Sequence, residues 1–433
     1  MLTKRMSAMF SLGAVLMAGC TGPEAGSEAA VTVFEGARLI VGDGGAPIED
    51  ALLVVEGDRF AYAGPRVRFF QLAESGMDVA EIPGDATYVD LSGKTVMPAI
   101  VNTHVHLAST REDRVEQLQH MAYYGAGVVV SLGLDSGDLP FEMRDEAVPD
   151  GARSLTAGRG ITAPEPGRSE VPSWVTSEAE ARTAVQELAA RQVDLVKVWV
   201  DERNGQYEKL SPVLYGAVID EAHGHGLLVT AHVFTLEDAK GLLRAGVDAF
   251  AHGVRDQDVD DELVALWRAR PGVVLVPNLP NPGVAVDLSW LSGTVPAEEL
   301  QEMQEASRDR PAAQESFGIQ ARNLARLNQA GVPIAFGTDG STPWAVHQEM
   351  EDMVRSGMTP AEVIRAATGN SAELLQRTDI GMVAGGRSAD FIVLDANPLE
   401  EITNTRRIAS VYLRGIEVDR DALGARFKGG TSR

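Results

Sequence analysis

The chain has 433 residues, 44% of them hydrophobic, and a formal net charge of −24 at pH 7. This hydrophobic share is ample for a large folded core, so the composition excludes a wholly disordered chain. The negative charge excludes nucleic acid as a partner, because phosphate groups would be repelled.

The first twenty residues have the pattern of a bacterial lipoprotein signal peptide. Lys4 and Arg5 precede an apolar run over residues 9–18, and the run ends in LMAGC, which resembles a lipobox with Cys20 as the lipidated residue. Residues 21–30 then predict a flexible tether. We therefore expect a lipid-anchored protein of the bacterial cell envelope, on the periplasmic side and at the outer membrane. The lipid anchor is its one expected membrane contact.

Strand-like and helix-like segments alternate over the middle of the chain. This alternation is typical of an α/β fold, and the number of strands predicts a (β/α)8 TIM barrel. The eight predicted strands cover residues 96–107, 127–133, 154–162, 194–201, 227–234, 249–254, 273–280 and 333–340.

The interval between the seventh and eighth predicted strands, residues 281–332, is longer than an ordinary barrel connection. Its first part is rich in turn-forming residues and contains Trp290 and Leu291. Because loops on this face of a barrel form the substrate pocket, the interval is a candidate lid. A packed surface loop is the alternative.

Possible metal ligands gather at the ends of the predicted strands. His104 and His106 are two residues apart in a strand, so their side chains point to the same face and can converge on one ion. Each could instead be an ordinary core or surface histidine. Six candidates at five strand ends favour a metal centre in the mouth of a barrel, and the four further candidates are Lys197, His232, His252 and Asp339.

Lys197 is the unusual member of this set. It is in phase with Leu195 and Trp199, which predicts that it points into the barrel. A charged amine would be unfavourable beside divalent cations, whereas an amine carboxylated by carbon dioxide becomes a carboxylate that can bridge two ions. A lysine whose stem packs at the rim while its amine reaches water is the alternative.

These motifs resemble the amidohydrolase superfamily, and more closely its imidazolonepropionase-like and prolidase-like members. The resemblance is carried by the opening segment 31–64, by segment 88–106 with its two histidines, and by segment 366–420 near the end. Two departures are Ala99 and Asn102, where the family usually has glycine and aspartate.

The resemblance implies the domain organisation of the mature chain. A TIM barrel over residues 96–380 would be flanked by a β-sandwich that both ends of the chain form together. Residues 31–95 would supply its N-terminal part and residues 381–433 its C-terminal part.

The resemblance also implies two divalent ions, most simply zinc. His104 and His106 would bind the more buried ion, and His232 and His252 the more exposed one. Carboxylated Lys197 would bridge the two ions, which requires carbon dioxide or bicarbonate.

Asp339 has two implied roles, as a ligand of the buried ion and as the catalytic residue. It would accept a proton from a hydroxide that bridges the ions and pass the proton to the leaving nitrogen. The expected reaction is hydrolysis of an amide C–N bond in a small molecule such as a dipeptide, an N-acyl amino acid or a cyclic amide. Hydrolysis of lactones, esters or organophosphates is an alternative, and a non-catalytic binding lipoprotein is another. The sequence leaves homo-oligomerisation open.

A few residues outside the ligand set are candidate substrate contacts. Arg159, Arg168 and Arg203 lie near predicted strand ends, where they could bind a substrate carboxylate. Arg168 also stands where many relatives have a substrate-contacting histidine. His347 lies in the loop after the eighth predicted strand, which faces the site. Surface ion pairing is the alternative for each arginine.

Overall fold

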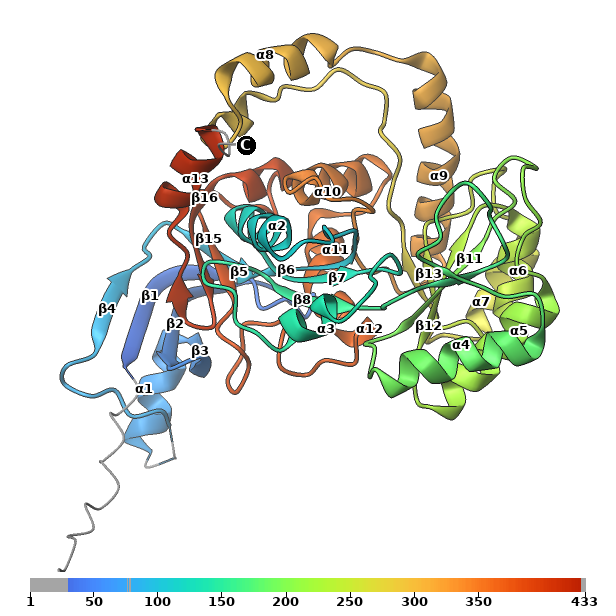
Figure 1. Cartoon of the computed structure of the whole chain (residues 1–433). Coiled ribbons are helices and arrows are strands. Elements are labelled where there is room, and N and C mark those ends of the chain that lie inside the picture. The colour runs from blue at the N-terminus through green and yellow to red at the C-terminus, as the bar shows by residue number, and fades with distance from the viewer. Residues whose placement is uncertain (1–29, 76, 78, 430–433) are drawn as a thin grey trace, which may run out of the picture.

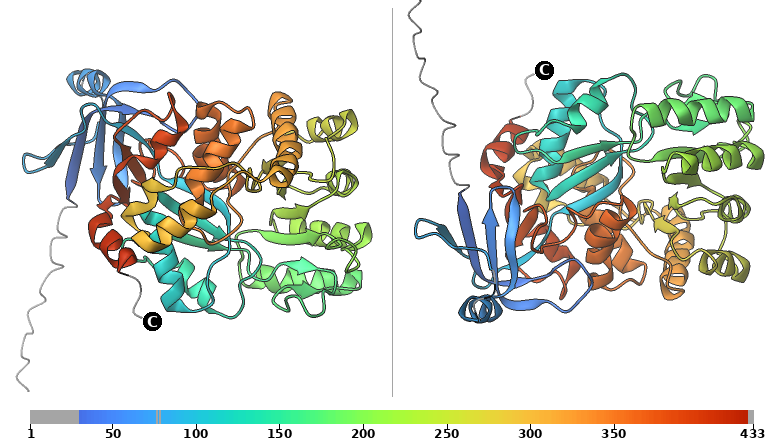
Figure 2. Two further views of the ribbon diagram at one scale, coloured as in Figure 1. Left: turned by 90° about the horizontal axis from the view of Figure 1, so that it is seen from above. Right: turned by 90° about the horizontal axis from the view of Figure 1, so that it is seen from below.

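The computed structural model describes residues 30–75, 77 and 79–429 (Figure 1). The predicted signal peptide, Cys20 and the tether up to residue 29 lie outside the described residues. Two parts make up the described chain, a flanking sheet and a barrel. The N-terminal and C-terminal strands lie together on one side of the barrel (Figure 2).

The flanking sheet contains strands from both ends of the chain. Its order is β17-β16-β15-β5-β1-β2-β3, and β4 also pairs with β1. The two ends meet at β5, which runs parallel to β1 and antiparallel to β15. The eight strands are β1 Val31–Leu39, β2 Ile48–Glu56, β3 Arg59–Pro65, β4 Thr87–Asp90, β5 Thr95–Pro98, β15 Phe391–Leu394, β16 Ile408–Leu413 and β17 Ile416–Glu417.

The sheet curls around an aromatic core. The ring of Phe391 stacks on Tyr412 with centroids 4.6 Å apart, and Phe34 meets both rings edge-on. Phe60, at the far edge of the strand order, still reaches Phe391 at 5.6 Å, and its backbone N–H donates to Arg387. The two ends of the sheet therefore face each other across one apolar core, as in a sandwich.

We expect Phe391→Ala to lower the free energy of unfolding by about 3–5 kcal/mol, because truncation leaves a cavity in this core. Phe391 is fully buried, whereas Tyr88 on β4 is 59% exposed and serves as the matched control. Tyr88→Ala should change stability by less than about 0.5 kcal/mol. Denaturant unfolding of both variants checks this, and equal effects would contradict the described core.

Seven parallel strands build most of the barrel wall, in two hydrogen-bonded groups. One group is β6-β7-β8, and the other is β11-β12-β13-β14 extended by the short strands β9 and β10. The bounds of these seven strands and of β9 and β10 are β6 Ile100–Val105, β7 Ala126–Ser131, β8 Arg153–Thr156, β9 Ile161–Thr162, β10 Ser173–Trp174, β11 Val196–Val200, β12 Val229–Val233, β13 Ala249–Ala251 and β14 Val274–Val276.

The prediction of a regular strand over residues 333–340 was wrong. Only Ile334 forms a bridge, to Leu275. The backbone then changes partner, since Phe336 accepts from Thr103 at 2.9 Å and Asp339 donates to His104 at 2.9 Å. This segment joins β14 to β6 by isolated backbone hydrogen bonds and does not form a continuous ladder with either strand. On the other side, a hydrogen bond between residues 194 and 156 joins β11 to β8.

The predicted first strand, residues 96–107, is two strands. Thr95–Pro98 belongs to the flanking sheet as β5, and Ile100–Val105 belongs to the barrel as β6. The chain passes between them at Ala99, whose N–H donates to Asp390 while Ile100 donates to Gly125. One hydrophobic run therefore serves two sheets.

Helices surround the barrel strands (Figure 2). They are α2 Arg111–Tyr123, α3 Leu139–Arg144, α4 Glu178–Ala190, α5 Pro212–Gly224, α6 Leu236–Ala245, α7 Asp261–Arg268, α9 Pro311–Gln329, α10 Ala345–Arg355, α11 Pro360–Arg365 and α12 Ser371–Leu374, with a π-helical turn η2 at Ala366–Asn370. Helix α1 Arg66–Glu74 packs on the flanking sheet, and η3 Ile402–Arg406 and α13 Arg420–Lys428 lie near the C-terminus. None of the described helices has the length and apolar character needed to cross a membrane.

The interval 281–332 is mostly helical and packs on the barrel. It contains η1 Ser289–Gly293, α8 Ala297–Ala306 and α9, and it arches over α10 toward α13 (Figure 1). Leu291 is fully buried, and the ring of Trp290 lies 5.9 Å from Tyr124. The start of the interval is thus a packed segment.

Candidate metal centre

The carboxylate of Asp339 is the hub of a histidine cluster at the mouth of the barrel. Its Oδ1 atom lies 3.0 Å from Nε2 of His106 and 3.2 Å from Nε2 of His104, both on or just after β6. Its Oδ2 atom lies 3.5 Å from Nε2 of His252, which follows β13. Three segments far apart in the sequence therefore meet here.

The spacing of three of these atoms suits one metal ion. Ligand atoms bound at about 2.0–2.2 Å to a shared ion lie about 3–3.5 Å from one another. The Nε2 atoms of His104 and His106 have this separation from Oδ1 of Asp339, and the three residues form a possible metal-binding group. The observed donors fit a divalent ion.

The two remaining predicted histidines extend the cluster. The rings of His104 and His252 have centroids 5.2 Å apart, and those of His252 and His232 are 4.7 Å apart. His232 is on β12, and its Nε2 contacts Oδ2 of Asp201 at 2.9 Å. Sequence reasoning did not single out Asp201 as a site residue, although it is in phase with Lys197.

Lys197, on β11, is fully buried in the same cluster. Its Nζ atom has no hydrogen-bond partner among the residues the structure describes. Burial lowers the pKa of the Lys197 amine to about 7. Gly133 lies against its stem, since a Cβ there would come within 2.8 Å of Lys197 Cγ. An amine so placed is neutral over part of the physiological range, and the neutral form is the one that reacts with carbon dioxide.

Two asparagines support the first pair of histidines. Oδ1 of Asn278 lies 3.0 Å from Nδ1 of His104, so a proton on Nδ1 leaves Nε2 free for an ion. Oδ1 of Asn102 accepts from the N–H groups of His104 and Thr338, and its amide donates to the Thr338 hydroxyl. The Asn102 side chain therefore connects β6 by hydrogen bonds to the segment that carries Asp339.

The electrostatics keep the nitrogens and oxygens of the cluster in their metal-binding forms. Burial lowers the pKa of His104 and of His252 well below the ordinary value, so both imidazoles are neutral at pH 7. Burial acts to raise the pKa of Asp339, but the hydrogen bond from His106 and the electrostatic effect of His104, Lys197 and His106 lower it overall. Asp339 is therefore ionised.

Three residues of the cluster and its support have a strained backbone conformation. His252, Asn278 and Asp339 have φ angles of 85°, 44° and 52°, in the left-handed region that non-glycine residues avoid. Each such residue costs on the order of 1–3 kcal/mol, and strained residues of this kind gather at functional sites.

The structure gives two of the candidate substrate contacts other roles. His347 is 2% exposed, its Nδ1 lies 3.1 Å from the Thr405 hydroxyl, and its ring packs on Trp290. It is a packing residue of α10, because its neighbours are Thr405 and the rings of Trp290 and Tyr124. Arg159 donates to backbone carbonyls of residues 170–172.

The other two arginines meet at one carboxylate. Arg168 is half-exposed and pairs with Glu165 at 2.6 Å, and Glu165 also pairs with Arg203 at 2.9 Å. Arg203 is the one that reaches the cluster, since its Nη1 lies 3.5 Å from Nε2 of His232.

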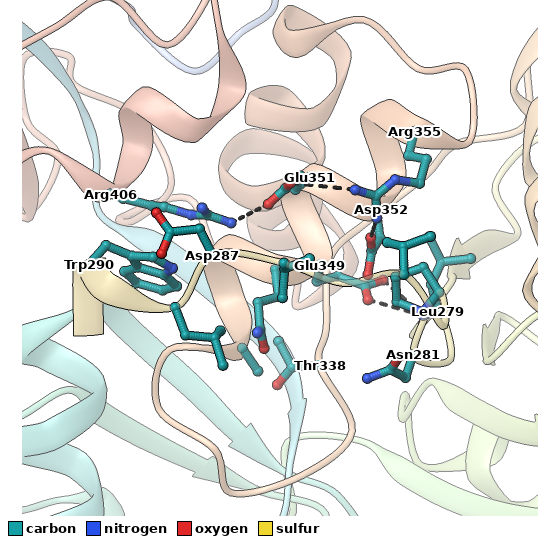
Figure 3. A pocket seen from close by; sticks show the side chains of 16 residues that line it. Leu279, Asn281, Asp287, Trp290, Thr338, Glu349, Glu351, Asp352, Arg355 and Arg406 are labelled. Atoms are coloured by element: carbon teal, nitrogen blue, oxygen red, sulfur yellow. Dashed lines mark hydrogen bonds and ion pairs between the residues drawn. The ribbon is translucent and has the colours of Figure 1, made fainter. Parts of the chain in front are cut away.

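A cavity of about 190 Å³ lies beside the cluster, between α10 and the segment that follows β14 (Figure 3). Thr338, the neighbour of Asp339 in the chain, is one of its lining residues, and carboxyl groups of α10 also line it. Burial raises the pKa of Glu349 well above its usual range and that of Asp352 to about 7. Glu349 accepts from the backbone N–H of Leu279. No sequence motif marks these residues.

The chain matches the amidohydrolase family over residues 95–418. An uncharacterised protein of Mycobacterium tuberculosis is 29% identical over 358 residues, which cover 79% of this chain and 90% of the relative. Imidazolonepropionase from Deinococcus radiodurans is 28% identical over 397 residues, covering 86% and 92%. The crystal structure of a provisionally assigned prolidase from Bifidobacterium longum superposes with a TM-score of 0.73 and 26% identity, covering 92% and 98%.

The chain belongs to the amidohydrolase family, whose solved members share its barrel and flanking β-sandwich over about nine-tenths of its length. It is a hydrolase acting on C–N bonds, and His104, His106 and Asp339 are its candidate metal-binding group.

Proposed function

We propose that the protein is a dinuclear metal-dependent hydrolase that cleaves the C–N bond of a small amide, as in a dipeptide, an N-acyl amino acid or a cyclic amide. The observation that carries this proposal is the meeting of four histidines, Asp339 and a buried Lys197 amine without a partner in the described structure. The similarity to an imidazolonepropionase and to a provisionally assigned prolidase supports it.

Each ligand has a proposed place. His104, His106 and Asp339 would hold one ion, and His232 and His252 the other, with Lys197 carboxylated between them. Divalent ions in such a site lower the pKa of bound water and polarise a carbonyl, and zinc suits the donor set.

Asp339 would move the proton. Its carboxylate is ionised and 36% exposed, so one of its oxygens can take a proton from the attacking water. The same oxygen can then give the proton to the leaving nitrogen, which departs as a neutral amine.

A substrate screen tests the proposal. Zinc-loaded protein is incubated with dipeptides, N-acyl amino acids and cyclic amides, and mass spectrometry detects the amine and carboxylic acid that cleavage releases. Matched esters, lactones and a phosphotriester form the control set. Faster turnover of the control set than of every amide would contradict the proposal and favour an ester, lactone or organophosphate hydrolase.

We also propose that the protein is lipid-anchored at the periplasmic side of a bacterial envelope, most simply in the outer membrane. This proposal rests on the sequence pattern that ends at Cys20. Cys20→Ser should abolish labelling by a palmitate analogue and move the protein out of the membrane fraction, while hydrolase activity stays intact. Unmodified wild-type protein in the cytoplasm would contradict it.

A further inference from the structure

Two arginines lie beside the proposed ion site, on loops that follow the strands on either side of β12. Arg203 follows β11, and Arg255 follows β13. Both stand at the carboxyl ends of parallel strands, the face on which barrel enzymes bind their substrates.

Arg203 is held rigidly. Its Nε lies 2.9 Å from Glu165 Oε1, and its Nη1 lies 2.7 Å from Asp201 Oδ2. These two carboxylates fix the plane of the guanidinium. The third nitrogen, Nη2, is buried and has no hydrogen-bond partner among the described residues. One donor group of a fixed guanidinium therefore remains available.

The positive charge of Arg255 has fewer polar contacts than that of Arg203. Its backbone N–H donates to the carbonyl of Phe234 at 2.9 Å, and its guanidinium lies 5.8 Å from the centre of the Phe234 ring. Its Nε is buried without a hydrogen-bond partner in the described part of the chain. Burial lowers its pKa, and the positive charge of Arg203 adds to this effect.

The guanidinium of Arg255 is half-buried, and it forms neither an ion pair nor a hydrogen bond with any residue in the described part of the chain. Asp201 and Asp339 act on Arg255 only through their charge, and the guanidinium donates a hydrogen bond to neither. A partly buried cation with unused donors is unfavourable unless a ligand supplies the missing acceptor.

We propose that Arg203 and Arg255 together form a carboxylate-binding site, which makes the substrate an amide that carries a free carboxylate. The proposal rests on the proposed function and narrows it to N-acyl amino acids and dipeptides, leaving out neutral cyclic amides. Guanidinium groups suit a carboxylate because their planar donors match its two oxygens. In an N-acyl amino acid the carboxylate is attached to the carbon that bears the amide nitrogen. Anchoring it beside His232 therefore places the C–N bond at the proposed ions.

Two probes that differ only in charge test the proposal. N-acetylglycine carries the carboxylate, and N-acetylglycinamide has a neutral amide in its place. Binding of each probe to zinc-loaded protein is measured by ligand-observed NMR titration, and cleavage of each is measured as released acetate.

The wild-type protein should bind N-acetylglycine more tightly than the amide, and Arg255→Gln should weaken its binding by about tenfold or more, as for a charge-assisted bidentate contact. Affinity for the amide should stay unchanged. Arg255→Lys keeps the charge but not the planar donors, so its affinity for N-acetylglycine should lie between those of the wild type and Arg255→Gln. Arg322→Gln, which removes an exposed arginine paired with Asp258 on the outer surface, is the matched control and should bind both probes as the wild type does.

Equal wild-type affinity for the two probes, no binding of N-acetylglycine, or an equal loss for both probes in Arg255→Gln would overturn the proposal. This test is independent of the proposed function, because binding is measured without turnover. Selective binding of N-acetylglycine with no cleavage of any amide would keep the arginine site and contradict the hydrolase assignment. Cleavage of amides with no preference for the carboxylate would keep the hydrolase assignment and contradict the arginine site.

Discussion

Asp339→Asn should lower turnover by roughly 100-fold or more, the usual scale for loss of a general acid–base group. The asparagine keeps the size of the side chain and one oxygen ligand, so metal content should fall only modestly. Steady-state kinetics with the best amide substrate, together with elemental analysis of the same sample, measures both effects.

His232→Ala is the comparison variant for Asp339. It removes a proposed ligand of the more exposed ion, so it should lose that ion and activity together. If Asp339→Asn kept near wild-type turnover with both ions bound, another group would carry the proton. His347 is unsuited because it is buried and contacts Thr405, whereas Asp201 lies 2.9 Å from His232 and would be tested next.

Lys197→Ala should abolish activity and release most of the bound metal. Lys197 is fully buried among the proposed ligands and has no partner of its own in the described structure, so its removal leaves a space with no bridging donor. Short carboxylic acids such as acetate or propionate should restore part of the activity by occupying that space. Activity is measured against carboxylic acid concentration, with metal content measured in parallel.

Lys209→Ala is the matched control for this experiment. Lys209 is on the surface and pairs with Asp238 at 2.9 Å, so its loss should affect neither metal content nor turnover. An active Lys197→Ala variant that needs no added acid would contradict the proposed bridge.

The positions of the metal-binding candidates were predictable because a strand has a fixed side-chain period. His104 and His106 share a face for that reason, and the same alternation turns Lys197 inward. The strand ends of a parallel barrel meet at one rim, so residues more than 200 positions apart, such as His104 and Asp339, come within hydrogen-bond distance.

Other features depend on contacts that the sequence does not encode locally. The segment 333–340 looks like a strand, but its backbone pairs with Leu275 and then with His104, and the turn at Asp339 has a positive φ. The helical phase of His347 with Met350 and Met353 was an available signal of a core position, and both methionines are buried. Arg255 carries no motif, and its isolation is visible only once its neighbours are in place.

The central claim is that the protein holds two divalent ions between its histidines, Asp339 and a carboxylated Lys197. Its most direct test is elemental analysis of fully active protein prepared with zinc and bicarbonate. The account predicts about two divalent ions per chain, as dinuclear hydrolases require. One ion or none in fully active protein would contradict it.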